Sequence, residues 1–93
     1  MSNHEESLVT QYVHKIQALA VRAEAGDDVQ AAVEAVVTEA VGHFRIIKTS
    51  DPQANLSAFQ GRLKIAAEIA SSSQPALKRT LQYAAKFCSS LTL

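Results

Sequence analysis

The sequence predicts an all-α protein, a four-helix up-down bundle with short connections, in which residues 1–93 form a single helical domain. In four segments, apolar residues recur at the three- and four-residue spacing of an amphipathic helix. Turn-forming residues separate these segments at Gly26, at residues 49–52 and at residues 71–75. The chain is 47% hydrophobic and 19% charged, a composition typical of globular rather than disordered proteins.

The first helix is expected from about His4 to Ala25. Its apolar stripe covers less than half of the helix circumference, as in an amphipathic helix. The stripe consists of Leu8, Val9, Tyr12, Val13, Ile16, Leu19, Ala20 and Ala23. Gly26 follows and can end the helix in a left-handed conformation.

The second helix is expected to begin at Asp27 or Asp28, as its N-cap, and to run to about Lys48. It is apolar over most of its circumference, and its narrow polar stripe consists of Gln30, Glu34, Thr38 and Arg45. Because a helix that is apolar on most sides has to be surrounded, we expect a central helix or a subunit interface. Gly42 lies inside this helix at a cost of about 1 kcal/mol relative to alanine, and it marks a close helix crossing or a kink.

Two boundaries that contain proline precede the last two helices. Ser50 or Asp51 can cap a helix whose first turn contains Pro52, and this third helix is expected to end near Ala70. Residues 71–75 repeat the pattern of a cap followed by proline, so the fourth helix is expected over residues 74–89. The serines at positions 71–73 are interpreted as helix punctuation. Since each connection is only about two to five residues long, neighbouring helices are expected to run antiparallel.

The second, third and fourth helices carry apolar residues beyond those that one core-facing stripe needs. Together these residues can form a patch on the order of several hundred Å², large enough to indicate association. We therefore expect a protein-binding module with a regulatory, adaptor or chaperone-like role, whose partner is another protein or a second copy in a homodimer. The expected contact residues are Ile65, Ile69, Tyr83 and Phe87, followed by Val37 and Val41.

Charge is distributed unevenly, although the net charge is zero. Residues 1–45 carry seven acidic and three basic side chains, whereas residues 46–93 carry two acidic and six basic ones. The two halves are expected to attract each other within the fold or across an antiparallel dimer, and the charges to set orientation and encounter rate rather than affinity.

An alternative function is nucleic-acid binding by the basic half. Residues 65–81 have the pattern of a helix-turn-helix unit, although the turn lacks glycine and is one residue too long. In this interpretation, phosphates and base edges would be contacted by Lys78, Arg79, Gln82 and Lys86.

No residue pattern points to catalysis, a cofactor or a metal site, so we do not expect an enzyme. His43 follows Glu39 by one helical turn, and the two form either a pH-sensitive, proton-accepting pair or an ion pair on the helix surface. His14, followed by Lys15, has the position of a phosphoryl acceptor in a phosphotransfer bundle, but the glycine that such a site needs one turn later is missing.

Cys88 is the single cysteine, so no intramolecular disulfide can form, which fits a reducing compartment. It falls on the apolar stripe of the fourth helix and is interpreted as a small core residue. The first residues lack the basic and apolar regions of a signal peptide, and no apolar run approaches 18 residues. We therefore expect a cytoplasmic protein without a membrane span.

Overall fold

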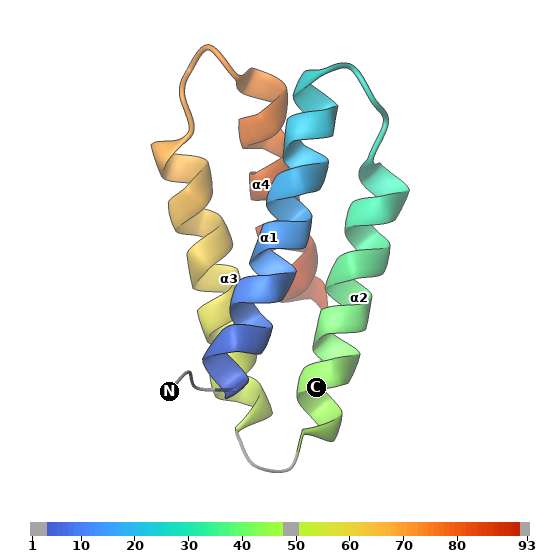
Figure 1. The fold of residues 1–93 in the computed structure, drawn as a ribbon, viewed down its shortest axis with the longest axis vertical. Coiled ribbons are helices and arrows are strands. Elements are labelled where there is room, and N and C mark those ends of the chain that lie inside the picture. Colours follow the sequence, from blue (N-terminus) through green and yellow to red (C-terminus); the bar gives the residue numbers. More distant parts are fainter. Residues whose placement is uncertain (1–3, 48–50, 92–93) are drawn as a thin grey trace.

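A computed structural model describes residues 4–47 and 51–91 of the chain, with side chains from Leu8 onward. The described ranges form four α-helices and no strand: α1 (His4–Glu24), α2 (Gln30–Ile46), α3 (Pro52–Ile69) and α4 (Pro75–Ser90). The helices point alternately up and down along the long axis of the molecule (Figure 1). The predicted all-α, four-helix up-down bundle is confirmed.

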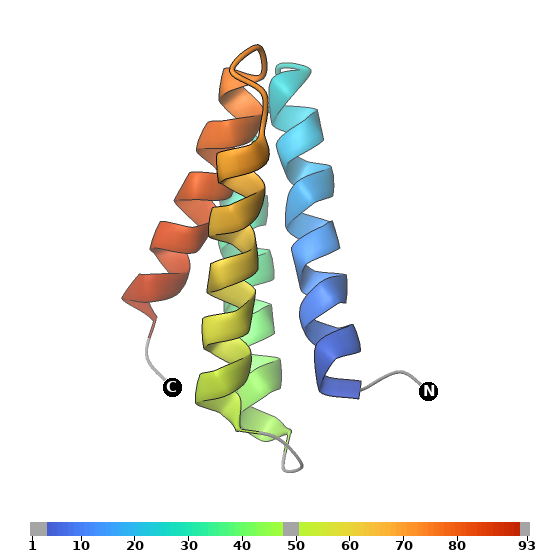
Figure 2. The same ribbon diagram turned by 90° about the vertical axis from the view of Figure 1, so that its left-hand side faces the viewer.

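The antiparallel helices α1 and α4 form the middle of the bundle. α3 lies along one side of this pair and α2 along the other, and α2 and α3 touch each other least (Figures 1 and 2). The parallel helices α1 and α3 are therefore neighbours, and so are α2 and α4. The expectation of a central second helix is wrong, because α2 lies at an edge and exposes Ala31, Ala32 and Ala35.

The helix ends follow the expected punctuation at α1 and α3. Gly26 has a φ of +106°, in the region that favours glycine, directly after α1. Before α3, the Asp51 side chain accepts a hydrogen bond of 3.0 Å from the backbone N–H of Gln53, and Pro52 occupies the first turn.

The remaining two helices begin differently from the sequence-based expectation. The N-cap of α2 is Val29 rather than an aspartate, and Asp28 accepts a hydrogen bond from the backbone N–H of Gln30 just outside the helix. At α4 the N-cap residue makes no side-chain hydrogen bond. Instead, Glu24 Oε1 at the end of α1 accepts from the backbone N–H groups of Ala76 at 3.0 Å and Leu77 at 3.1 Å. A carboxylate from another helix therefore caps α4.

The core receives side chains from all four helices, and aromatic rings fill part of it. Tyr12, Phe44 and Phe59 pack edge to face, with ring centroids 5.9 to 6.4 Å apart. Val37 and Val41 lie on the inward stripe of α2 with Phe44, and they are 0% and 3% exposed. The prediction that these two valines contact a partner is therefore wrong, because the bundle's own core covers them.

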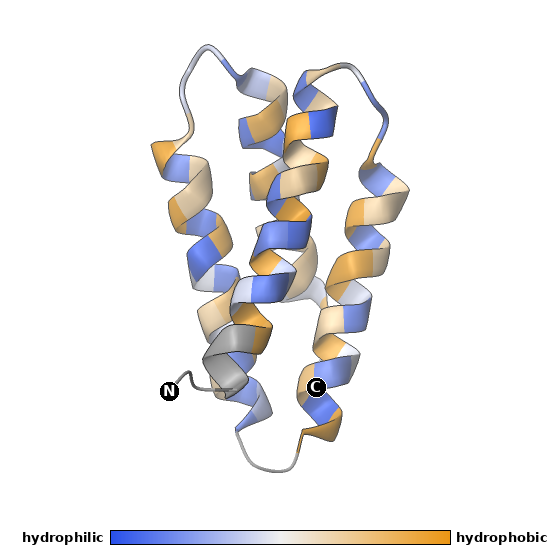
Figure 3. Ribbon diagram, in the orientation of Figure 1, coloured by the Kyte–Doolittle hydropathy of each residue, from blue (hydrophilic) through white to orange (hydrophobic). Residues whose placement is uncertain are grey.

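Polar and apolar residues alternate along every helix of the bundle (Figure 3). Within the described ranges, no helix combines the length and the apolar character that crossing a bilayer requires.

Candidate functional site

The residues expected to contact a partner do not share one surface. The two valines of α2 belong to the core. Ile65 and Ile69 on α3 are 59% and 76% exposed. Tyr83 and Phe87 are half-buried on α4, where Tyr83 binds a residue of α2. The predicted contact residues therefore do not lie on one continuous surface, and Ile65 and Ile69 are the most exposed of them.

Ile69 borders an apolar groove between α3 and α1, and Ile65 lies one helical turn before it on α3. Val21 on α1 is 59% exposed, and it lines a groove of about 300 Å³ together with Ile69. A hydrogen bond of 2.6 Å from Arg62 Nη1 to Thr10 Oγ1 joins the two helices about three turns before Val21 on α1. We call Val21, Ile65, Ile69 and the groove between the two helices the α1–α3 face.

Small side chains account for the groove. Three alanines line its walls, and because their side chains are short, α1 and α3 leave a hollow between them. Two leucines of α4 complete the lining. None of the described lining residues is charged. They are Gln17, Ala20, Val21, Ala66, Ile69, Ala70, Leu77 and Leu81. An uncharged, apolar hollow with large aliphatic side chains at its rim has the composition of the centre of a protein interface.

Sequence reasoning did not identify Val21 as a contact residue. Val21 lies outside the inward stripe of α1, next to Arg22, whereas the predicted contact residues all lie on the other three helices. The sequence feature that could have identified Val21 is an aliphatic residue on the otherwise polar side of an amphipathic helix, because such a residue does not pack into the core.

Tyr83 and Phe87 belong to the contact between α2 and α4. Their rings stack with centroids 6.1 Å apart, and the Tyr83 hydroxyl donates a hydrogen bond to Glu34 of α2. This hydrogen bond to the Glu34 carboxylate raises the pKa of the Tyr83 phenol. The two aromatic residues are thus engaged within the bundle on the side away from α3.

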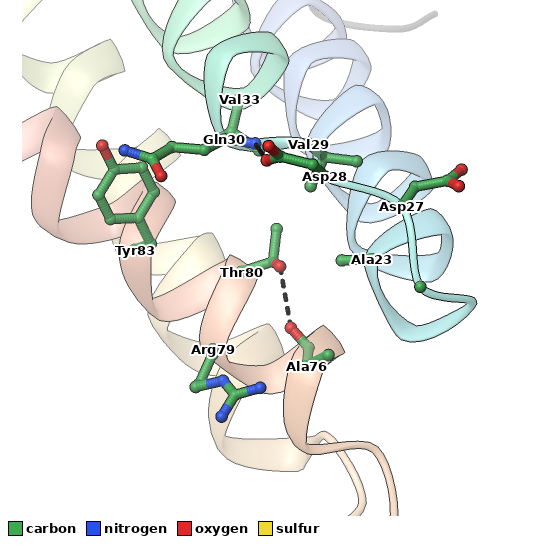
Figure 4. Close-up of a pocket in the computed structure, with 11 residues that line it drawn as sticks. Ala23, Asp27, Asp28, Val29, Gln30, Val33, Ala76, Arg79, Thr80 and Tyr83 are labelled. Carbon is green, nitrogen blue, oxygen red and sulfur yellow. Dashed lines mark hydrogen bonds between the residues drawn. The ribbon is translucent and has the colours of Figure 1, made fainter.

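A second hollow of about 490 Å³ lies between the starts of α2 and α4 (Figure 4). Much of its polar lining already binds within the chain: Asp28 accepts from the backbone N–H of Gln30, and Thr80 Oγ1 donates to the Ala76 carbonyl at 2.9 Å. The Arg79 guanidinium lies on the opposite side of the hollow from Asp28 (Figure 4). The mixed charges and the internal hydrogen bonds make this hollow a helix junction rather than an apolar binding groove.

The residues of the nucleic-acid alternative lie along one exposed side of α4. Arg79, Gln82 and Lys86 are exposed and Lys78 is half-buried. The α3–α4 hollow that Gln82 and Lys86 line also contains Glu68. α3 and α4 pack side by side as an antiparallel hairpin (Figure 2). A helix-turn-helix unit instead crosses its helices steeply, so that motif is not formed here.

Glu39 and His43 take part in a hydrogen-bonded cluster between α1 and α2. The hydroxyl of the buried Tyr12 donates to Glu39 Oε2 at 3.2 Å and lies 3.0 Å from His43 Nδ1. The Lys15 ammonium lies 4.0 Å from Glu39 and 5.0 Å from the centre of the Tyr12 ring. Burial raises the pKa of the Tyr12 phenol, and the Glu39 carboxylate raises it further. The cluster links Glu39 and His43 of α2 to Tyr12 of α1.

The remaining chemistry-bearing residues lie apart from one another. His14 is exposed on α1. Cys88 is fully buried, and burial raises the pKa of its thiol to about 11, which disfavours the reactive thiolate. Among the described residues, no three histidine, cysteine, aspartate or glutamate side chains gather in a way that could hold a metal ion.

The chain matches no protein-family model, no curated protein and no solved structure. The feature of the chain that suggests a function is the α1–α3 face, where exposed aliphatic side chains lie beside an uncharged groove.

Proposed function

We propose that this chain is a small protein-binding module that accepts the apolar ridge of a partner helix on the α1–α3 face. The observation that carries the proposal is an uncharged groove bordered by the exposed Val21 and Ile69, with the exposed Ile65 one helical turn before Ile69 on α3. Two parallel helices with a hollow between them have the shape that binds an amphipathic helix, which inserts residues spaced three and four apart. A module of this kind would act as a regulator, an adaptor or a chaperone.

The exposed area is large enough to supply a moderate binding energy. Val21, Ile65 and Ile69 together expose the equivalent of about two whole aliphatic side chains, whose burial would contribute about 3–6 kcal/mol. Association also loses translational and rotational freedom, so a partner has to bring further contacts or a preformed helix. This balance favours reversible binding over a permanent complex.

The test is binding of a fluorescein-labelled peptide of about 20 residues, designed as an amphipathic helix with isoleucine or leucine at positions i, i+3, i+4 and i+7. Fluorescence anisotropy is expected to show saturable binding to the wild-type chain. Ile69→Glu is expected to weaken this binding at least tenfold, about 1.4 kcal/mol, because it places a charge at the rim of the groove.

Ile46→Glu is the matched control. Ile46 is 70% exposed but lies at the end of α2, away from the α1–α3 face. Binding by this variant is expected to equal that of the wild type. Equal weakening by both variants, or no difference between the peptide and a scrambled sequence, would contradict the proposal.

A further inference from the structure

We infer that a second copy of this chain is a partner of the α1–α3 face, so that two copies form a two-fold symmetric dimer. This inference rests on the proposed function and names the helix that occupies the groove. The α3 helix itself carries the ridge that the groove accepts, because Ile65 and Ile69 are one turn apart and both are exposed.

The ridge and the groove lie side by side on the same surface. Ile69 forms one wall of the groove, and its side chain is nevertheless 76% exposed, so it projects beyond the hollow that it borders. When one surface carries both a projection and a hollow, a two-fold rotation places each projection against the hollow of the other copy. Both contacts form at once, and the assembly closes at two chains.

Electrostatics do not oppose the pairing of two copies. The chain has no net charge, so two copies do not repel each other at long range. The described lining of the groove is uncharged, and Arg62 does not line it but lies two helical turns before Ile69 on α3, where it donates to Thr10. Like charges therefore do not oppose each other at the centre of the contact, in agreement with the depletion of charge at interface centres.

Other apolar groups of the bundle are less suited to join two copies. The Tyr83 and Phe87 rings are half-buried and stack on each other, Tyr83 binds Glu34 of α2, and the α2–α4 hollow carries aspartate and arginine. The hollow between α3 and α4 is lined by Lys64, Glu68 and Lys86. The α1–α3 face thus combines exposed aliphatic area with an uncharged lining.

The test is sedimentation velocity of the full chain from about 1 µM to about 1 mM, a range that covers weak to moderate dimers. The wild type is expected to change from monomer to dimer across this range. Ile69→Glu and Val21→Glu are each expected to raise the dissociation constant at least about tenfold. Far-UV circular dichroism is expected to show wild-type helicity for both, because both side chains are more than half exposed.

Ile46→Glu serves again as the matched control, and its dimer is expected to have the dissociation constant of the wild type. Dilution of a ¹⁵N-labelled sample is expected to shift amide signals of residues 17–21 and 65–70 while leaving those of the outer side of α2 in place. These positions locate the contact independently of any substitution.

Three outcomes overturn the inference: a wild-type monomer at all concentrations, a dimer that Ile69→Glu does not weaken, or equal weakening by Ile46→Glu. A monomer that still binds the amphipathic peptide overturns the homodimer alone. A chain that neither dimerises nor binds the peptide overturns both the homodimer and the proposed function.

Discussion

At the scale of single residues, Glu24 links the end of α1 to the start of α4. Its carboxylate lies at the end of α1, where a negative charge is unfavourable, yet it accepts hydrogen bonds from the first turn of α4. These bonds satisfy the Ala76 and Leu77 N–H groups, which have no partner within their own helix. Glu24 therefore fixes the start of α4 against the end of α1.

Glu24→Ala is expected to lower the free energy of unfolding by about 1–2 kcal/mol, since it removes a cap with two hydrogen bonds. Glu24→Gln keeps one side-chain oxygen as an acceptor and is expected to lose less. Glu68→Ala, at an exposed position of α3, is the matched control and is expected to change stability by less than about 0.5 kcal/mol. Urea denaturation followed by circular dichroism measures all three, and equal midpoints for Glu24→Ala and the wild type would show that the cap does not contribute.

At the scale of elements, proline and glycine at the helix boundaries predicted where the helices lie in the sequence but not which helices pack against each other. Pro52, Pro75 and Gly26 act on the backbone of their own segment, so their effect can be inferred without knowing the fold. The position of α2 was misjudged because alanine counts as apolar although its exposure costs little, and Ala31 and Ala35 face outward. Whether Tyr83 meets α2 or solvent depends on which helices are adjacent, and helical periodicity contains no such information.

The two glycines of α2 and its preceding turn allow a test of backbone against packing effects. A Cβ at Gly42 would meet no atom within 4 Å, so this glycine does not mark a close helix crossing. Gly42→Ala is expected to raise the free energy of unfolding by about 0.5–1 kcal/mol through the better helix propensity of alanine. Gly26→Ala is expected to lower it by about 1 kcal/mol or more, because the φ of +106° is strained for alanine. Thermal and urea unfolding of the two variants measure this opposite response. A destabilised Gly42→Ala variant would contradict this expectation, because it would show that a Cβ at position 42 meets a neighbouring part of the bundle.

At the scale of the whole molecule, the charge asymmetry has a smaller structural role than the sequence suggests. The ion pairs Lys15–Glu39 and Arg22–Asp27 both join residues within the acidic half, and all four side chains are more than half exposed. Exposed pairs contribute little to stability and are screened by salt. The shared core, to which all four helices contribute, joins the two halves.

Salt dependence separates the two functions that this charge distribution allows. A dimer held by the α1–α3 face buries uncharged groups, so its dissociation constant is expected to change by less than about threefold between 50 and 500 mM salt. Binding of a random DNA duplex by the basic side of α4 would release counterions, and its affinity would fall at least about tenfold between 50 and 200 mM salt. Sedimentation and duplex anisotropy titrations at several salt concentrations measure the two quantities on the same protein. Arg79→Glu combined with Lys86→Glu is expected to leave the dimer intact, because both residues lie on the exposed side of α4, outside the α1–α3 face. If duplex binding falls steeply with salt and is lost in this double variant, the basic side of α4 is a nucleic-acid surface. If the dimer weakens as steeply with salt, charge holds the two copies together, and the aliphatic rim of the groove does not.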